Sequence, residues 1–266
     1  MDIVRRAIEE DGALRDLTAP VVGDRRVRGK IVAKQDLVVC GLKVAGEVFR
    51  RVGARLAPRA RDGQCVRRGA VLALVSGPAR RVLAGERTAL NFLQRFSGIA
   101  TLTRRFVERA RPVRIFDTRK TTPGLRALEK YAVRCGGGHN HRMGLHEGAM
   151  IKDNHVAVVG DLEGLREKVW GLAAAGRPVV IEAQTLEQAL LFATFPVQVV
   201  MLDNFTAAGL RRAARLVRAV NPKVEIEASG GVTLGNVRSI ARTGVDRISV
   251  GALTHSAPAA DLSLEL

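Results

Sequence analysis

The sequence is poor in aromatic residues and cysteine and contains no long apolar run. Aromatic residues make up 4% of the 266 positions, with one Trp and one Tyr, so a base-stacking platform for nucleic acid is poorly supplied. No apolar run approaches the ~18 residues that a membrane-spanning helix requires. The opening MDIVRRAIEEDG is charged and lacks the apolar stretch of a signal peptide. We therefore expect a cytoplasmic protein without a membrane partner.

The three cysteines, Cys40, Cys65 and Cys135, are widely spaced and form no CxxC pair. Their odd number and spacing do not match a disulfide framework or a structural zinc motif. We expect buried or unreactive thiols.

Positive charge is in large excess, with a formal net charge of +17. The first 112 residues carry +13 and the remainder +4. A basic surface is typical of proteins that bind nucleic acid or an anionic substrate. Because aromatic residues are scarce, we expect an anionic substrate and no nucleic acid. A basic nucleic-acid-binding protein is the alternative, which filter binding to DNA across a salt series would test.

The first part of the chain mixes short strand and helix patterns. Residues 27–34 alternate like a half-exposed strand, and residues 37–41 are the expected partner strand. A helix is expected at 41–53, followed by a strand at 70–78. A long helical pattern runs from about residue 80 to residue 110, and the Ser97–Gly98 pair in its middle predicts a bend or a break.

After Pro112, short β-branched runs alternate with helical stretches, which predicts successive βα units and a parallel sheet. The runs are 113–117, 149–153, 179–183, 199–203, 224–231 and 247–252. About six strands fit a barrel with fewer strands than the usual eight, and a doubly wound open sheet is the alternative. In either fold, the chemistry gathers where the parallel strands end.

The last two runs end in small residues, ASGGV at 228–232 and VGALTH at 250–255. Glycines let a phosphate approach backbone N–H groups, and barrel enzymes commonly bind phosphate after their final strands. Tight turns also favour glycine, so plain turns are the alternative. We favour phosphate binding because both segments follow the final strands.

Charged residues follow the other runs. Glu182 and Asp203 close two successive strands, and two carboxylates there suit Mg²⁺, ribose hydroxyls or acid–base chemistry. Four cations, Arg119, Lys120, Arg142 and Lys152, are expected at the same edge. Such cations repel one another unless the ligand is strongly anionic. The pattern predicts a ligand with several carboxylates and phosphates.

A zinc cluster is a competing interpretation of the segment 135–155. Cys135, His139, His141 and His146 lie within twelve positions. A zinc site needs converging ligands and supporting hydrogen bonds. We favour the anion site over zinc.

At these residues the sequence resembles the quinolinate phosphoribosyltransferase family, also called nicotinate-nucleotide pyrophosphorylase (carboxylating). The similar segments are DTRKTTPGLRALEKYAVRCGGGHNHRMGL, IKDNH, ERTALNFLQRFSGIAT, LDNF, EASGGV and VGALTHS. They extend along essentially the whole chain, and the long motifs are highly specific.

The resemblance implies an N-terminal α/β sandwich domain (1–111), in which the dimer contacts lie, and a catalytic parallel α/β barrel domain of about six strands (112–266). The C-terminal tail is expected to pack back on the first domain. It also implies that quinolinate and phosphoribosyl pyrophosphate are converted to nicotinate mononucleotide, pyrophosphate and CO₂ with Mg²⁺, in NAD biosynthesis. A homodimer, or a hexamer built from three dimers, is the implied assembly.

Position by position, the resemblance assigns a role to each matching residue. The residues implied to bind quinolinate are Arg87, Thr118, Arg119, His141, Arg142 and Lys152, with Arg87 reaching across the dimer interface. For phosphoribosyl pyrophosphate they are Lys120, Glu182, Asp203, Ser229, Gly230, Gly231, Gly251 and His255. The implied catalytic residues are Lys120, Lys152, Glu182 and Asp203, and Glu182 and Asp203 are the implied metal ligands, directly or through other oxygens.

Two segments depart from the family pattern. EDGALRDLT (10–18) retains one displaced glycine in the turn before Asp-x-Thr, and VVIEAQTLEQ has one acid, Glu182, where relatives often have two. The family is not usually histidine at the positions of His139 and His146, so neither receives a role. A phosphoribosyltransferase acting on nicotinate is the alternative among enzymes. The number of cations favours the dicarboxylate.

Overall fold

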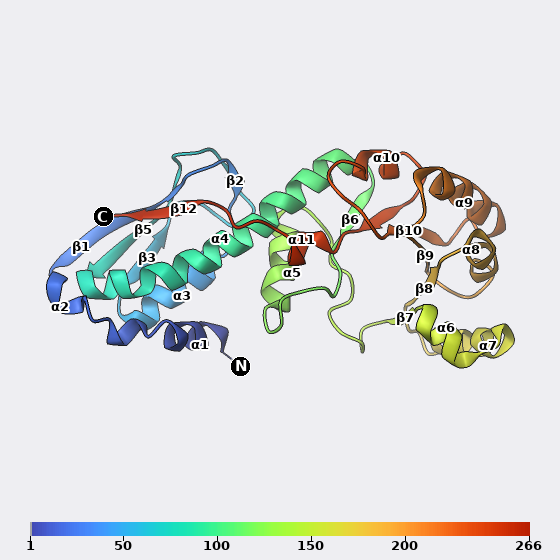
Figure 1. Ribbon diagram of the computed structural model, residues 1–266, viewed down its shortest axis with the longest axis horizontal. Helices are drawn as coiled ribbons and strands as arrows, with labels where there is room; N and C mark the ends of the chain where they lie inside the picture. Colours follow the sequence, from blue (N-terminus) through green and yellow to red (C-terminus); the bar gives the residue numbers. More distant parts are fainter. Residues whose placement is uncertain (1) are drawn as a thin grey trace. The chain divides into compact units, whose positions relative to one another are not determined.

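The computed structural model describes residues 2–266, apart from the side chain of Leu14 (Figure 1). The chain folds into two compact units. The first comprises the residues up to Arg104 together with 121–137 and 253–266, and the second comprises 105–120 and 138–252. No helix in the described part of the chain is long and apolar enough to cross a membrane.

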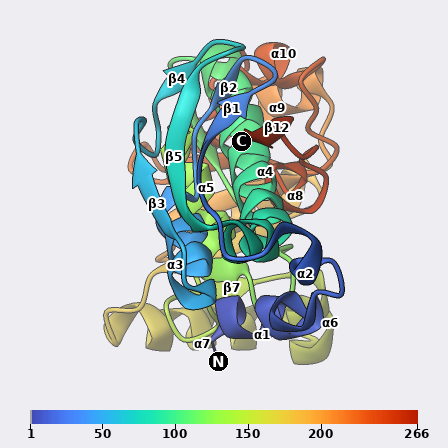
Figure 2. The same ribbon diagram turned by 90° about the vertical axis from the view of Figure 1, so that its left-hand side faces the viewer.

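The first unit contains an antiparallel sheet with strand order β12-β1-β5-β3, seen from the side in Figure 2. Strands β2 and β4 form a separate antiparallel pair. The strands are β1 (Arg26–Ala33), β2 (Leu37–Val38), β3 (Arg55–Pro58), β4 (Cys65–Val66), β5 (Val71–Pro78) and β12 (Leu262–Glu265). The helices assigned to this part of the chain are α1 (Ile3–Glu10), η1 (Ala13–Arg15), α2 (Ala19–Val22), α3 (Leu42–Val52), α4 (Ala79–Ala110), α5 (Arg126–Cys135) and α11 (Ala252–His255).

The expected pairing of residues 27–34 with 37–41 is wrong. Strand β1 pairs with β5 and with β12, whereas β2 pairs with β4. The reason is length: β2 has only two residues before Gly41 turns the chain at φ 104° and α3 begins at Leu42. The ladder between β1 and β5 extends instead from Arg26 to Val32.

Helix α4 is continuous, so of the bend or break expected at Ser97–Gly98, a break does not occur. The Ser97 hydroxyl donates to the backbone carbonyl of Cys40 at 3.2 Å, which gives the buried serine a partner outside the helix. A Cβ at Gly98 would overlap the Pro258 carbonyl oxygen. Glycine is needed at position 98 because the backbone of Pro258 passes against α4. The Ser97–Gly98 pair therefore allows close packing against the helix.

The second unit is built on a parallel sheet with strand order β6-β11-β10-β9-β8-β7. The strands are β6 (Arg114–Phe116), β7 (Ala149–Ile151), β8 (Val179–Ala183), β9 (Val199–Asp203), β10 (Glu225–Ser229) and β11 (Arg247–Ser249). The helices between them are α6 (Asp153–Val159), α7 (Leu162–Ala174), α8 (Leu186–Phe192), α9 (Ala207–Val220) and α10 (Val237–Ala241), drawn in yellow to red in Figure 1. All six expected strands are confirmed.

The strand order distinguishes the barrel from the doubly wound alternative. A doubly wound sheet reverses its order at a switch point. Here β7 to β11 follow one another without reversal, and the first strand, β6, pairs with the last, β11. This is the order of a barrel, with no ladder between β6 and β7 among the described residues. The sheet is therefore barrel-like.

The compact units group the chain differently from the expected domains 1–111 and 112–266, whose boundary stays a prediction. Strand β12 pairs with β1, so the C-terminal tail groups with the N-terminal sheet. Segment 121–137 also belongs to the first unit. There the buried Glu129 carboxylate accepts from Arg95 of α4 at 2.8 Å and from the Thr122 hydroxyl at 2.8 Å. These polar bonds tie α5 to the long helix.

Candidate functional site

The strand register of the second unit places the predicted residues on one face of the sheet. Glu182 pairs with Met201, and Ser229 pairs with Asp203 two residues further along. Because side chains two apart in a strand point the same way, Glu182, Asp203 and Ser229 share a face. They lie toward the carboxyl ends of parallel strands. The sheet thus concentrates these polar groups at one edge.

A cavity of about 370 Å³ lies at this edge. Its lining residues are Thr118, Arg119, Lys120, His141, Arg142, Met150, Lys152, Glu182, Met201, Asp203, Ser229 and Ser249. Nine of the predicted site residues are among them, and all belong to the second unit. The cavity joins cations, carboxylates and hydroxyls in one place.

The turn after β6 positions two of the cations. The hydroxyl of Thr118 accepts a hydrogen bond from the backbone N–H of Lys120 at 3.0 Å. This local bond closes a small turn, as Ser and Thr commonly do at strand ends. Arg119 and Lys120 are exposed at the cavity. Thr118 therefore orders the backbone that carries both.

Arg142 is held beside Arg119. Its guanidinium donates to the Gly148 carbonyl at 2.7 Å. Burial, followed by the Arg119 cation, lowers the pKa of Arg142. Two cations close enough to disfavour each other's charge would be stabilised by an anion between them. On electrostatic grounds alone, the pair suits a dicarboxylate or a phosphate.

Lys152 and Glu182 form an ion pair at 2.6 Å. Glu182 is buried, whereas the Lys152 side chain is 44% exposed. The sequence predicted both residues at the edge but did not predict their pairing. An ammonium group has three N–H donors, so Lys152 can keep Glu182 and still donate to a ligand.

Asp203 ends β9 and leads into a strained turn. The side-chain amide of Asn204 donates to the Asp203 carboxylate at 2.6 Å, and the backbone of Asn204 has φ 58°. A Cβ at Gly230 would overlap the Asn204 side-chain oxygen. Gly230 also has φ 89°. Glycine at this position thus lets the two strand ends approach and shapes the cavity rim.

His141 faces a buried ionic network. Its Nδ1 accepts from the backbone N–H of Arg142 at 2.9 Å, and its Nε2 lies 3.8 Å from Glu227. Glu227 also accepts from Arg247 Nε at 2.7 Å and from the Ser249 hydroxyl. Burial raises the pKa of Glu227, but the nearby His141 ring and the Arg247 cation outweigh burial, so the pKa lies below its ordinary value. Both nitrogens of His141 therefore face protein groups.

Asp117, which directly follows β6, is buried and has no role predicted from the sequence. One carboxylate oxygen accepts from the His141 N–H at 2.8 Å, and the other accepts from the Asn140 amide at 2.6 Å. His139 forms a parallel bridge with Phe116 just before. Asp117 thus fixes the segment that carries His141 and Arg142 against the end of β6.

Met150, Met201, Ser249 and Glu227 were also missed. A signal was available: Met150, Met201 and Glu227 each lie two residues before a predicted site residue in the same strand or at its end. The two-residue period of a strand puts them on the same face. The pairing between strands that assembles them is not encoded in that period.

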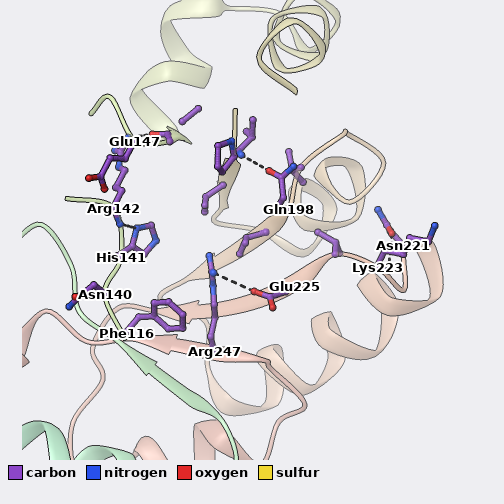
Figure 3. Close-up of a pocket in the computed structure, with 18 residues that line it drawn as sticks. Phe116, Asn140, His141, Arg142, Glu147, Gln198, Asn221, Lys223, Glu225 and Arg247 are labelled. Atoms are coloured by element: carbon purple, nitrogen blue, oxygen red, sulfur yellow. Dashed lines mark hydrogen bonds and ion pairs between the residues drawn. The ribbon is translucent and has the colours of Figure 1, made fainter. Parts of the chain in front are cut away.

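A second cavity of about 580 Å³ lies at the opposite ends of the strands (Figure 3). It is lined by residues at strand starts, such as Ala149, Val179 and Glu225, and it shares His141 and Arg142 with the first cavity. In Figure 3, Arg247 lies between Phe116 and Glu225. This cavity lacks the predicted phosphate loops and carboxylates, so the site is the first one.

The structure also bears on the zinc interpretation. Cys135 belongs to the first unit, whereas His139, His141 and His146 belong to the second. Among the described residues, the one group of metal-ligating side chains that converges is Cys40, Asp62 and Cys135. The four residues of the zinc interpretation do not form such a group.

The remaining predicted residues lie outside the cavity lining. Gly231 has φ 58° and accepts from the Asn236 amide through its carbonyl at 2.9 Å, so it belongs to a hydrogen-bonded loop after β10. Gly251 follows β11. Arg87, exposed on α4, and His255 belong to the first unit. Their roles stay predictions.

The fold and the cavity define a class. A barrel-like parallel sheet, with glycine loops after its last strands and clustered cations and carboxylates at their carboxyl ends, is the arrangement of an enzyme that acts on phosphorylated, anionic substrates. Two family models match the chain: the N-terminal domain of quinolinate phosphoribosyl transferase over residues 16–97, and the C-terminal domain over residues 99–265. The chain belongs to the quinolinate phosphoribosyltransferase family.

Individual relatives agree along the whole chain. A nicotinate-nucleotide pyrophosphorylase [carboxylating] of Mycobacterium leprae is 43% identical, with 100% of this chain and 96% of that protein covered. A chloroplastic one of Oryza sativa is 37% identical, with 99% and 76% covered. The solved nicotinate-nucleotide pyrophosphorylase of Francisella tularensis has a TM-score of 0.91 at 36% identity, covering 99% of this chain and 94% of that one.

Proposed function

We propose that this protein converts quinolinate and phosphoribosyl pyrophosphate to nicotinate mononucleotide, pyrophosphate and CO₂, a step of NAD biosynthesis. The observation that carries the proposal is the cavity where four cations face two carboxylates. Family membership supports the same reaction. Three free cysteines are typical of a reducing compartment, which supports the expected cytoplasmic location.

Quinolinate would occupy the cationic side of the cavity. Arg119 and Arg142 are close enough that their charges interact, and a dicarboxylate relieves that repulsion. Lys152 offers its remaining donors to a carboxylate while Glu182 holds the amine in place. His141 contributes through position, because its ring anchors the Arg142 backbone. These groups hold the pyridine in one orientation.

Phosphoribosyl pyrophosphate would occupy the side with the carboxylates and glycine loops. Glu182 and Asp203 can accept hydrogen bonds from ribose hydroxyls. Ser229, Gly230 and Gly231 present a hydroxyl and backbone N–H groups at a strand end, which suits a phosphate. Lys120 can neutralise charge on the departing pyrophosphate. We therefore assign these residues to the second substrate.

The reaction then needs no protein nucleophile. The pyridine nitrogen attacks C1′ of the ribose as pyrophosphate leaves with the bonding electron pair. The ring becomes cationic, and loss of CO₂ from C2 leaves an electron pair that the adjacent N⁺ stabilises. That electron pair then takes a proton from solvent, which forms the C2–H bond of nicotinate mononucleotide. The protein positions the two substrates and stabilises developing charge, which are the two largest sources of rate in such a displacement.

The donor set fits Mg²⁺. Glu182 and Asp203 line the same cavity and offer hard oxygen ligands, and Mg²⁺ is usually bound by one or two carboxylates together with substrate phosphates. When bound, the ion would neutralise pyrophosphate charge. Cys and His ligands, which suit zinc, are not required for this role.

We propose a homodimer in which Arg87 completes the site of the neighbouring subunit. Arg87 is exposed in the N-terminal third of α4, and it is flanked by the buried Thr88. Val158, Leu162 and Trp170 on α6 and α7 are also exposed, as are apolar residues of the first unit. Apolar side chains gathered on neighbouring helices commonly mark an interface. The alternative for Arg87 is an ordinary surface arginine.

The test is turnover of purified protein with both substrates, followed by detection of nicotinate mononucleotide. We expect activity to vanish when divalent cations are chelated and to return with Mg²⁺. Nicotinate offered in place of quinolinate distinguishes the alternative phosphoribosyltransferase. Turnover of nicotinate with no turnover of quinolinate would contradict the proposal.

A further inference from the structure

Two cysteines that lie far apart in the sequence meet in the first unit. Cys40 follows β2, and Cys135 is the last residue of α5. Their sulfur atoms and a carboxylate oxygen of Asp62 all lie within 4.8 Å of one another. All three residues belong to one compact unit. The reaction proposed above uses none of them.

Hydrogen bonds fix the cluster from three sides. The backbone N–H of Cys40 donates to the Ser97 hydroxyl at 3.0 Å, and that hydroxyl donates to the Cys40 carbonyl at 3.2 Å. Asp62 accepts from the N–H groups of Gly41 and Leu42 at 3.1 and 3.2 Å. The cluster is therefore anchored to α4 and to the beginning of α3.

The third side comes from α5. The Tyr131 hydroxyl donates to the second carboxylate oxygen of Asp62 at 3.1 Å. Tyr131 and Cys135 are four residues apart, so they share one face of α5. The helix end is thus fixed beside Cys40, and the two thiols are held near each other by the fold.

The two thiols are not equivalent. Cys40 is fully buried, whereas Cys135 is partly exposed. A hydrogen bond from the Cys40 thiol lowers the pKa of Cys135; burial opposes this, and the Tyr131 hydroxyl adds to the lowering. The same thiol contact, together with burial, raises the pKa of Cys40. Cys135 is the thiol that ionises first and the one that solvent reaches.

A bound metal fits this cluster less well. Structural zinc sites have four protein ligands, and three converge here among the residues described. Asp62 already accepts hydrogen bonds on both oxygens. Two thiolates and a carboxylate would also place several negative charges at the C-terminal, negative end of α5. An accessible, easily ionised thiol beside a buried second thiol is instead the arrangement of a redox pair.

We propose that Cys135 and Cys40 form a peroxide-sensitive dithiol that closes to an intramolecular disulfide. The Cys135 thiolate attacks one oxygen of hydrogen peroxide; the O–O bond breaks, hydroxide leaves and becomes water with one proton, and Cys135 becomes a sulfenic acid. The Cys40 sulfur then attacks the Cys135 sulfur. The S–O bond breaks, and the hydroxyl leaves as water with the Cys40 proton. Peroxide is reduced by two electrons, which the two thiols supply.

Cys65 provides an internal control, because it is exposed and lies outside the cluster. Reduced full-length protein is treated with increasing hydrogen peroxide, its remaining thiols are alkylated, and its peptides are mapped by mass spectrometry without reduction. We expect free thiols to fall from three to one per chain. The product should be a Cys40–Cys135 linked peptide that dithiothreitol cleaves, with Cys65 still alkylated.

Variants locate the order of the two steps. Cys40→Ala should stop at a sulfenic acid on Cys135 that dimedone labels, and Cys135→Ser should leave Cys40 reduced. Cys65→Ser should behave as wild type. The wild-type map keeps the proposal falsifiable even if a buried Cys40→Ala chain does not fold. Three free thiols after peroxide treatment, or oxidation of Cys65 before the pair, would contradict it. One equivalent of zinc that co-purifies and protects both thiols would also overturn it.

Discussion

At the scale of single residues, Arg142 and Lys152 are the groups whose removal should most affect quinolinate. Each lines the cavity and carries positive charge there. We expect Arg142→Ala and Lys152→Ala each to lower kcat/KM by at least about tenfold, or about 1.4 kcal/mol. Arg211→Ala on the exposed side of α9 is the matched control and should leave kcat/KM unchanged. Tight quinolinate binding and normal turnover in both variants would remove these residues from the site.

Glu227 links the site to stability against acid. Its pKa is lowered in the folded protein, so its stabilising effect is present above the ordinary value of 4.5 and is lost as the pH falls through the folded pKa. Glu227→Gln should therefore unfold more easily at pH 7, by up to about 3–5 kcal/mol because Arg247 loses a charge partner. Its stability should also fall less steeply below pH 4.5.

Urea titrations across pH 3–7 measure both effects, with the exposed Glu163→Gln on α7 as the control. Equal acid sensitivity in wild type and Glu227→Gln would show that the buried network does not hold this carboxylate ionised.

At the scale of helices and strands, the long helix α4 depends on one glycine. A Cβ at Gly98 would overlap the Pro258 carbonyl oxygen, which is backbone and cannot rotate away. We expect Gly98→Ala to destabilise the protein by about 1–3 kcal/mol in thermal or urea unfolding.

Gly171 in α7 is the matched control, because it is helical and a Cβ at this position would meet no atom within 4 Å. Gly171→Ala should stabilise by about 0.5–1 kcal/mol through the unfolded chain alone. If Gly98→Ala were equally stabilising, the close packing of residue 258 on α4 would be wrong.

Local sequence patterns predicted where the strands lie better than they predicted which strands pair with each other. The six β-branched runs each became a strand of the parallel sheet, because buried parallel strands need continuous apolar residues. The pairing of β1 with β12 joins the two ends of the chain and leaves no periodic signal. For the same reason, the meeting of Cys40 with Cys135 was missed, and the thiols were expected to be unreactive.

Seven of the nine predicted residues that line one cavity were expected from strand ends and residue chemistry, which are local properties, whereas Thr118 and His141 were expected from the family resemblance. The ion pair of Lys152 with Glu182 and the network around Glu227 are not local, since they depend on which strands become neighbours. The strand order and register decide which side chains become neighbours, and both are seen only in the folded sheet.

At the scale of the whole molecule, the proposed homodimer makes a quantitative prediction for Arg87. Arg87→Ala and Lys152→Ala are each expected to be inactive as homodimers. In a mixed dimer, one site keeps Lys152 and receives the other chain's intact Arg87, while the opposite site carries both defects. Random mixing makes about half the dimers mixed, so roughly a quarter of wild-type activity should return.

Co-refolded mixtures that stay as inactive as their parents would contradict the role of Arg87 across the interface. A surface arginine in an exposed ion pair contributes under about 1 kcal/mol to stability. Near-normal activity of Arg87→Ala alone would therefore also contradict the role of Arg87 across the interface. Mixing Lys152→Ala with Arg142→Ala is the control, because both defects lie in the same unit and the Arg87 role is untouched.

The central claim is that one cavity joins N-ribosylation to decarboxylation. The most direct measurement supplies quinolinate labelled with ¹⁴C in its C2 carboxyl group, phosphoribosyl pyrophosphate and Mg²⁺ to the purified protein, and counts labelled CO₂ against nicotinate mononucleotide. We predict equal amounts of the two products, and none of either without phosphoribosyl pyrophosphate. Formation of the mononucleotide from nicotinate alone, or no labelled CO₂ from quinolinate, would contradict it.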